Sequence, residues 1–164
     1  MDEYIIPNVP YVAQTDPRWC WNAGYRMMLL AAGRPDFLVD CFPNDADMKD
    51  RGILDSEFQA CRDALGLTSS SWNSFNSLDK LQQKLEMYGP IWCSGFWCDG
   101  HKHIVIARGV GDQGVYVNDP YRGMTGAAAR PSWWSWGKFV NNMNRVPFAF
   151  QHWYTKPPAC ADSD

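Results

Sequence analysis

One cysteine lies where a helix is expected to begin, with a tryptophan on each side: Trp19-Cys20-Trp21. A thiol in the first turn of a helix meets the positive end of the helix dipole, and that field favours the thiolate. The thiolate is the nucleophile of cysteine hydrolases, so Cys20 is the candidate for nucleophilic catalysis. Gln14, six residues earlier, carries an amide that can donate a hydrogen bond to a developing oxyanion.

A candidate base lies downstream. His101 and His103 alternate with Lys102, so in a strand both imidazoles point to one face and compete for the role. His103 directly begins the apolar run Ile104-Val105-Ile106, and we predict that it is the base. His152 lies between Gln151 and Trp153 in the last expected strand, where a structural role is predicted.

The candidate orienting group is Asp119, at the end of an expected strand and before Pro120. Asn-Asp-Pro is also an ordinary turn sequence. Asn118 is the alternative, but neighbouring residues of a strand face opposite ways, so only one of the two can serve.

Four stretches, in this order, resemble the papain-like cysteine peptidases, and most closely the small C39-type peptidases and the family of the plant-pathogen effector AvrRpt2. They are Val9-Pro10-Tyr11-Val12-Ala13-Gln14 leading to Trp19-Cys20-Trp21-Asn22-Ala23-Gly24, then Gly89-Pro90-Ile91-Trp92, then His103-Ile104-Val105-Ile106-Ala107-Arg108-Gly109, and Val115-Tyr116-Val117-Asn118-Asp119-Pro120. The family usually continues the nucleophile as Trp-Ala-Ala, whereas this chain has Trp21-Asn22-Ala23-Gly24. That departure bears on the packing of the helix more than on the chemistry.

The resemblance implies a cysteine endopeptidase that needs no metal and no cofactor. It assigns Asp119 to the triad as the partner of the His103 imidazole, and it assigns the oxyanion hole to the Gln14 amide and the Cys20 backbone N–H. It also implies a protein substrate and a bacterial effector or toxin, delivered without a Sec signal into the cytoplasm of a host or competing cell. A toxin of this kind implies a cognate immunity protein that covers the cleft. The same machinery also serves deamidases, peptidoglycan amidases and acyltransferases.

The alternative function is a binding module held together by zinc, because four residues of the types that bind zinc lie within a short stretch: Cys93, Cys98, His101 and His103. Structural zinc sites more often use Cys-x2-Cys pairs with longer separations between the pairs. This reading also leaves Cys20 and Gln14 without a role, so we expect no metal site.

The bulk composition limits the classes of function. The net charge is −3 and there is no basic run, so we expect no binding to nucleic acid. The acidic start Met1-Asp2-Glu3 is unlike a secretory signal, and no apolar run approaches the length of about 18 residues that spans a membrane. Of six cysteines we expect most to be reduced, with Cys93 and Cys98 the pair best placed for a local disulfide.

The elements that must position these residues form an α+β pattern, with helices first and antiparallel strands second. Helices are predicted near 19–32, 55–65, 78–88 and 136–143, with strands at 91–96, 103–108, 114–118 and 147–154. Segments 34–53 and 120–135 are predicted as loops. This suits a papain-like layout, in which a central nucleophile helix packs on the sheet that carries the base. We predict a single domain over 1–154 and a loose tail over 155–164.

The segment Ser132-Trp133-Trp134-Ser135-Trp136 contains three of the nine tryptophans. So many large rings in a short loop are hard to bury together, and aromatic residues are favoured as interface anchors. We therefore predict exposed rings at a partner surface here, with Trp134 as the anchor. The alternative is that at least two of the three rings pack under the sheet.

Overall fold

The computed structural model describes residues 3–124 and 131–158. The helices are α1 (Cys20–Ala31), α2 (Asp45–Arg51), α3 (Phe58–Leu65), α4 (Leu78–Tyr88), α5 (Pro120–Met124) and α6 (Trp136–Asn141), with short 3-10 turns at Asp36–Cys41, Asp55–Glu57 and Trp72–Phe75. The strands are β1 (Tyr4–Ile5), β2 (Thr68–Ser69), β3 (Ile91–Cys98), β4 (His101–Gly111), β5 (Gly114–Asn118), β6 (Ser132–Ser135) and β7 (Phe150–His152).

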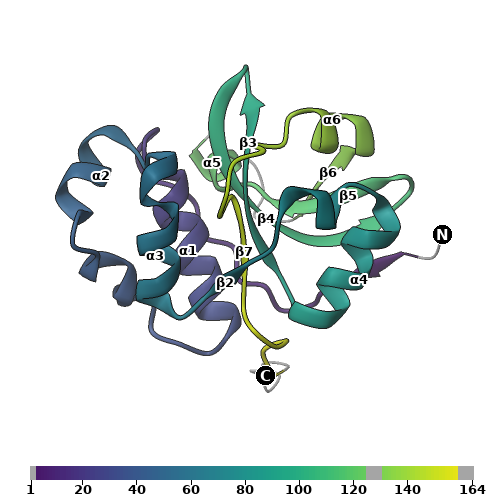
Figure 1. Cartoon of the computed structure of the whole chain (residues 1–164), viewed down its shortest axis with the longest axis horizontal. Coiled ribbons are helices and arrows are strands. Elements are labelled where there is room, and N and C mark those ends of the chain that lie inside the picture. Colours follow the sequence, from purple (N-terminus) through teal and green to yellow (C-terminus); the bar gives the residue numbers. More distant parts are fainter. Residues whose placement is uncertain (1–2, 125–130, 159–164) are drawn as a thin grey trace.

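The strands form one antiparallel sheet in the order β2-β7-β3-β4-β5-β6, and β1 pairs with β4. Helices α1, α2 and α3 gather on one side of the molecule, and the sheet with α4 and α6 forms the other (Figure 1). The expected α+β class, with a nucleophile helix packed on an antiparallel sheet, is confirmed.

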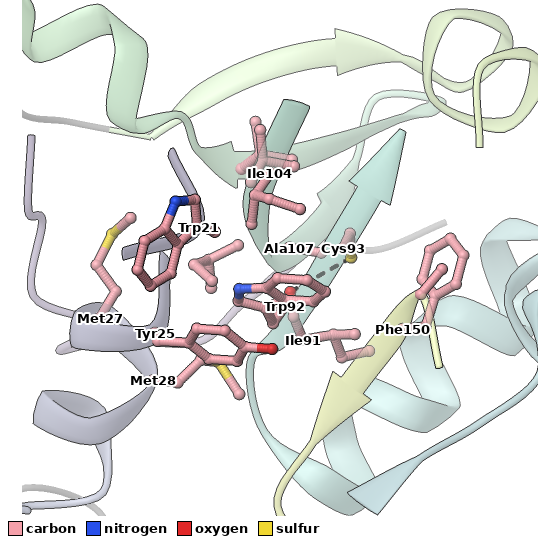
Figure 2. Packing of buried hydrophobic residues seen from close by; sticks show 14 of the residues in the cluster. Trp21, Tyr25, Met27, Met28, Ile91, Trp92, Cys93, Ile104, Ala107 and Phe150 are labelled. Carbon is pink, nitrogen blue, oxygen red and sulfur yellow. Dashed lines mark hydrogen bonds between the residues drawn. The ribbon is translucent and has the colours of Figure 1, made fainter. Parts of the chain in front are cut away.

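The central helix α1 approaches the sheet closely because it carries a glycine where it crosses β3 and β4. A Cβ atom on Gly24 would lie 2.9 Å from Cγ2 of Ile104 and 3.1 Å from the ring of Trp92. The next residue, Tyr25, is fully buried and stacks on Trp92, with ring centroids 4.7 Å apart. Figure 2 shows Trp92 reaching from the sheet towards Tyr25. The Asn22-Ala23-Gly24 departure is thus accommodated by close helix–sheet packing.

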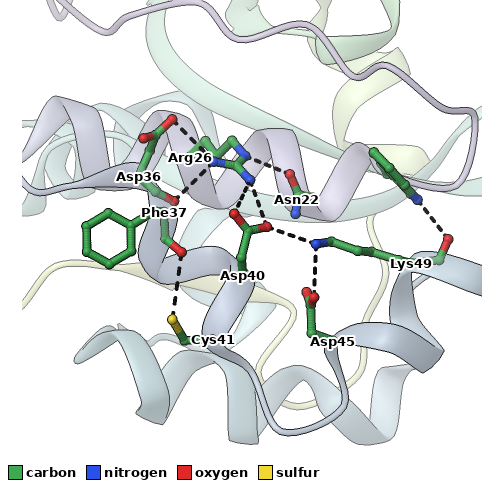
Figure 3. Close-up of polar contacts among 9 residues, drawn as sticks. Asn22, Arg26, Asp36, Phe37, Asp40, Cys41, Asp45 and Lys49 are labelled. Carbon is green, nitrogen blue, oxygen red and sulfur yellow. Dashed lines mark hydrogen bonds and ion pairs between the residues drawn. The ribbon is translucent and has the colours of Figure 1, made fainter.

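Polar contacts join α1 to the segments that follow it (Figure 3). Nε of Arg26 donates to Oδ1 of Asn22 at 2.8 Å, and its guanidinium reaches Asp40 at 2.8 Å and Asp36 at 3.3 Å. Lys49 on α2 pairs with the same Asp40 at 2.9 Å. Such partly exposed pairs contribute at most about 1 kcal/mol each, so their main effect is to orient α2 against α1.

Several predicted elements are confirmed by their local signals. Gly33 and Gly66 end helices with positive φ angles of 69° and 76°, and the Ser77 hydroxyl caps α4 by accepting from the backbone N–H of Lys80 at 3.1 Å. The loop predictions were wrong in part, because 34–53 contains a 3-10 turn and α2, and 120–135 contains α5 and β6.

The prediction of exposed tryptophan rings in this segment holds for Trp133 and is wrong for Trp134. Trp133 and Trp134 lie in the edge strand β6, whose residues alternate between buried and exposed. Trp134 is therefore only 8% exposed, whereas Trp133 is 45% exposed. Trp134 packs against Trp97 at 5.4 Å between ring centroids, and Trp97 stacks on Phe139. The ring proposed as an interface anchor therefore belongs to the core.

Lys156 lies within 3.3 Å of the Tyr4 hydroxyl, and the Pro157 ring lies beside Gly89. Residues 159–164, which include Cys160 and most of the predicted tail, lie outside the described residues, so the domain boundary at 154 stays a prediction. Over the ranges described, no helix is both long and apolar enough to cross a membrane.

Candidate active site

Cys20 is the first residue of α1 and is partly exposed. In the described part of the chain no side chain caps this helix and no acidic residue occupies its first turn, so its positive end is left to the thiol. The flanking tryptophans fix the start of the helix. Nε1 of Trp19 donates to the Lys49 carbonyl at 2.7 Å, and Nε1 of Trp21 donates to the Arg18 carbonyl at 2.9 Å.

His103 lies near the start of β4 and is only 5% exposed. Its Nε2 lies 2.7 Å from Oδ1 of Asp119, and the Cys20 thiol is near enough to the ring to affect its protonation. Burial lowers the pKa of His103, but the hydrogen bonds to Asp119 and Cys20 and the attraction of their charges outweigh it and raise this pKa to about 9. A charged imidazole beside a cysteine is the arrangement that activates a nucleophilic thiol, so the position of His103 suits the role of a base.

Asp119 is held from several directions. Its Oδ1 accepts from the backbone N–H of Tyr121 at 3.0 Å, and its backbone carbonyl accepts from the Tyr11 hydroxyl and, at 3.2 Å, from the Arg122 N–H. Pro120 follows as the first residue of α5, where the missing N–H costs nothing. The carboxylate therefore points at His103 from a fixed helix start.

Gln14 is 3% exposed and tied to both sides of the site. Its backbone N–H donates to the Pro120 carbonyl at 3.1 Å, and its Nε2 donates to the Asp16 carbonyl at 3.0 Å. That carbonyl also accepts from the N–H of Trp19 at 3.0 Å, which links the amide to the start of α1. An amide nitrogen has two hydrogens, so one remains for an oxyanion.

The Oε1 atom of Gln14 is buried and, within the described residues, has no partner. The same holds for Nδ2 of Asn22, and both residues line a cavity of about 170 Å³ beside the amide. Nδ2 of Asn22 is a hydrogen-bond donor and Oε1 of Gln14 is an acceptor, so the two unpaired atoms are of complementary type.

The alternative residues lie elsewhere. His101 is exposed and lines a cleft next to Cys20. Asn118 is fully buried, accepts from Arg108 at 3.2 Å and donates to the Val9 carbonyl at 3.3 Å. His152 is 1% exposed and lies 2.8 Å from the Ser70 hydroxyl, which agrees with a structural role.

The zinc reading gains no support from the geometry. Cys93 is fully buried and its thiol donates to the Ile91 carbonyl at 3.3 Å, while burial raises the pKa of this thiol. His103 is already engaged by Asp119 and Cys20. Over residues 3–124 and 131–158 no three His, Cys, Asp or Glu side chains are grouped as a metal site would require.

The five cysteines in these ranges are free thiols.

Two supporting residues had no role in the sequence analysis. Tyr11 lies in the stretch before Gln14, and its hydroxyl reaches across to the backbone of Asp119. Tyr121 is 41% exposed, and its ring meets the His103 ring edge-on with centroids 6.4 Å apart. Tyr121 is marked only by its position two residues after the predicted carboxylate, and neither contact could be predicted without the fold.

Comparison with solved structures shows the same fold. A C39-like peptidase from Bacillus anthracis matches with a TM-score of 0.60 at 15% identity, covering 93% of this chain and 98% of that one. A double glycine motif protease from an AMS/PCAT transporter, solved in complex with the leader peptide, matches with a TM-score of 0.53 at 16% identity, covering 93% and 97%. Comparison with curated protein sequences gave no match.

The sequence profile of the papain-like cysteine protease AvrRpt2 matches residues 4–135, which is most of the chain and includes all four predicted site residues. The two structural neighbours described above are a C39-like peptidase and a double glycine motif protease. The resemblance drawn from the sequence is therefore confirmed, and the chain belongs to the AvrRpt2 family of papain-like cysteine proteases.

Proposed function

We propose that this protease is an endopeptidase that acts on a protein target through Cys20, His103 and Asp119. The Cys20 thiolate attacks the carbonyl carbon of the scissile peptide bond. The carbon–nitrogen bond breaks as His103 gives its proton to the leaving amine. Water then attacks the thioester, with His103 taking its proton, and releases the new carboxyl end and the free thiol.

In this proposal Asp119 orients His103 and stabilises its charged form. The oxyanion of each tetrahedral intermediate accepts from the Gln14 amide and from the backbone N–H of Cys20. Loss of one such donor in other hydrolases costs about 3 kcal/mol of the barrier.

The observation that carries the proposal is the position of His103, which is buried, lies 2.7 Å from Asp119 and is close enough to Cys20 for the thiol to affect its charge. The neighbour solved with a leader peptide supports a peptide as the substrate. Deamidases, amidases and acyltransferases use the same groups, and they differ in their products.

We further propose that the protease is a delivered bacterial effector or toxin that acts in the cytoplasm of a target cell. Membership of the AvrRpt2 family supports this. A producing cell that is itself a target would then need an immunity protein over the cleft.

The test is proteome-wide sequencing of new N-termini after a cell lysate is exposed to wild type or to Cys20→Ala. New N-termini that depend on Cys20 are expected, and circular dichroism serves to verify that the variant is folded. Deamidated or acylated proteins without new N-termini would contradict the endopeptidase and indicate one of the alternative reactions.

A further inference from the structure

A cleft of about 420 Å³ opens directly beside Cys20. Three segments far apart in the sequence line it: the turn into α1, the segment after α2 and the start of β4. They contribute Pro17, Arg18, Cys20, Trp21, Arg51, Gly52, Ile53, Leu54, His101, Lys102 and Ile104. A cleft of this volume is roughly 9 Å across, on the order of three extended residues at about 3.4 Å each.

The charged residues that line this cleft are all basic. They are Arg18, Arg51 and Lys102, and no Asp or Glu of the described ranges is among the lining residues. This is opposite to the chain as a whole, whose net charge is −3. Like charges gathered in a cleft attract and orient ligands of opposite charge.

Each cation has a carboxylate partner outside the lining: Arg18 and Arg51 each bind one through two nitrogens, and Lys102 binds one through its ammonium group. Arg51 binds Glu57 through both terminal nitrogens at 2.8 and 3.0 Å, and Glu57 also accepts from the N–H of Leu54 at 2.9 Å. Arg51 also donates to the Gly52 carbonyl at 2.9 Å and so fixes the wall of the cleft, and its side chain is less exposed than that of Arg18, at 38% against 51%.

Arg18 and Lys102 keep donors for a ligand. The Arg18 side chain is 51% exposed, and three of its five N–H groups contact Asp16 and the Asp50 carbonyl. The Lys102 ammonium contacts Asp55 at 3.0 Å, which leaves two of its three hydrogens. Leu54, 45% exposed, provides an apolar surface for the stem of a side chain between them.

We propose that this protease selects substrates with an acidic side chain, Asp or Glu, in the cleft beside Cys20, and that Arg18 and Lys102 determine this specificity. The inference rests on the proposed endopeptidase function and adds the substrate class. The selected carboxylate lies within about three residues of the scissile bond, as the size of the cleft requires.

The first test is digestion of a tryptic peptide library from a bacterial lysate by wild type and by Cys20→Ala, with mass spectrometry of the new ends. Enrichment of Asp and Glu at one position within three residues of the cut is expected. Cleavage without acidic enrichment would overturn the inference but leave the endopeptidase standing. No Cys20-dependent cleavage would instead overturn the endopeptidase function and the inference with it.

The second test uses a cleaved peptide from that library and its twin with Gln in place of Glu. Wild type is expected to favour the Glu peptide about fivefold or more in kcat/KM, and added salt should reduce the ratio. Arg18→Gln and Lys102→Gln should each lower the ratio towards one. Lys84→Gln, which removes a charge from α4 away from the cleft, should leave it unchanged.

The ratio of kcat/KM for the Glu and Gln peptides distinguishes a loss of specificity from a distorted active site, because a distorted site slows the cleavage of both peptides equally. Both residues neighbour the site, so each single variant is measured along with its thermal unfolding. A preference that persists in both folded single variants would exclude Arg18 and Lys102 as its cause.

Discussion

At the scale of single residues, Cys20 is distinguished from the other thiols by its surroundings. Cys61 and Cys93 are buried, and burial raises the pKa of Cys61 to about 12. Cys41 is exposed and so is the fair competitor. We expect iodoacetamide at pH 7 to alkylate Cys20 faster than Cys41, because thiolates react and Cys20 lies at a helix start beside a charged His103. Faster labelling of Cys41, measured by peptide mass spectrometry, would contradict the assignment.

The charge of His103 gives a second prediction. Its pKa of about 9 depends on Asp119 and Cys20, so Cys20→Ala should lower it substantially. Because the folded pKa lies above the ordinary 6.5, the charged ring stabilises the wild type fully below about pH 6.5, and this stability is lost as the pH rises through about 9. NMR titration of the imidazole in both proteins measures the change. An unchanged pKa in Cys20→Ala would show that the thiol does not contribute.

The two histidines of β4 should differ in their importance. His103→Ala should lower kcat/KM by about 10²-fold to 10⁴-fold, because it removes the acid and base. His101→Ala should act mainly on KM, since this ring lines the cleft without contacting Asp119. Asp119→Ala should fall between them. Steady-state kinetics on a cleaved peptide tests this order. Full activity of His103→Ala would contradict the assignment of His103 as the catalytic base.

At the scale of elements, the site depends on how closely α1 lies against the sheet. Gly24→Ala should destabilise the protein by about 1–3 kcal/mol, because the added methyl group would meet the buried Ile104 and Trp92. This outweighs the gain of about 1 kcal/mol in helix propensity. Gly137→Ala is the matched control, since its Cβ in α6 would meet only Asn141 at 3.8 Å. Urea unfolding should show loss of stability in the first variant and none in the second.

At the scale of the whole molecule, the aromatic residues join the C-terminal elements to the sheet. Trp134→Ala should destabilise the protein by about 3–5 kcal/mol, because its buried ring packs on Trp97. Trp133→Ala should cost much less, since this ring is 45% exposed and its one hydrogen bond is to the Gly111 carbonyl. Thermal unfolding distinguishes them, and a stable Trp134→Ala would restore the interface reading.

The sequence determined the elements whose signals are local. Ser77 caps α4, Gly66 ends α3, and the apolar spacing of α1 specifies a buried helix, because near neighbours alone supply these contacts. It did not determine α2, α5 and β6. These are short segments, and β6 exists through its pairing with β5. A strand of four residues has no stability of its own.

The sequence also determined the residue types of the candidate site and their order. Which of two neighbouring candidates completes the site was decided by the tertiary structure, because only the folded chain brings His103, and not His101, to 2.7 Å from Asp119. The basic cleft was likewise invisible in the sequence. Arg18, Arg51 and Lys102 meet only when the start of α1, the end of α2 and β4 pack together, and the net charge of −3 says nothing of which side chains line one cleft.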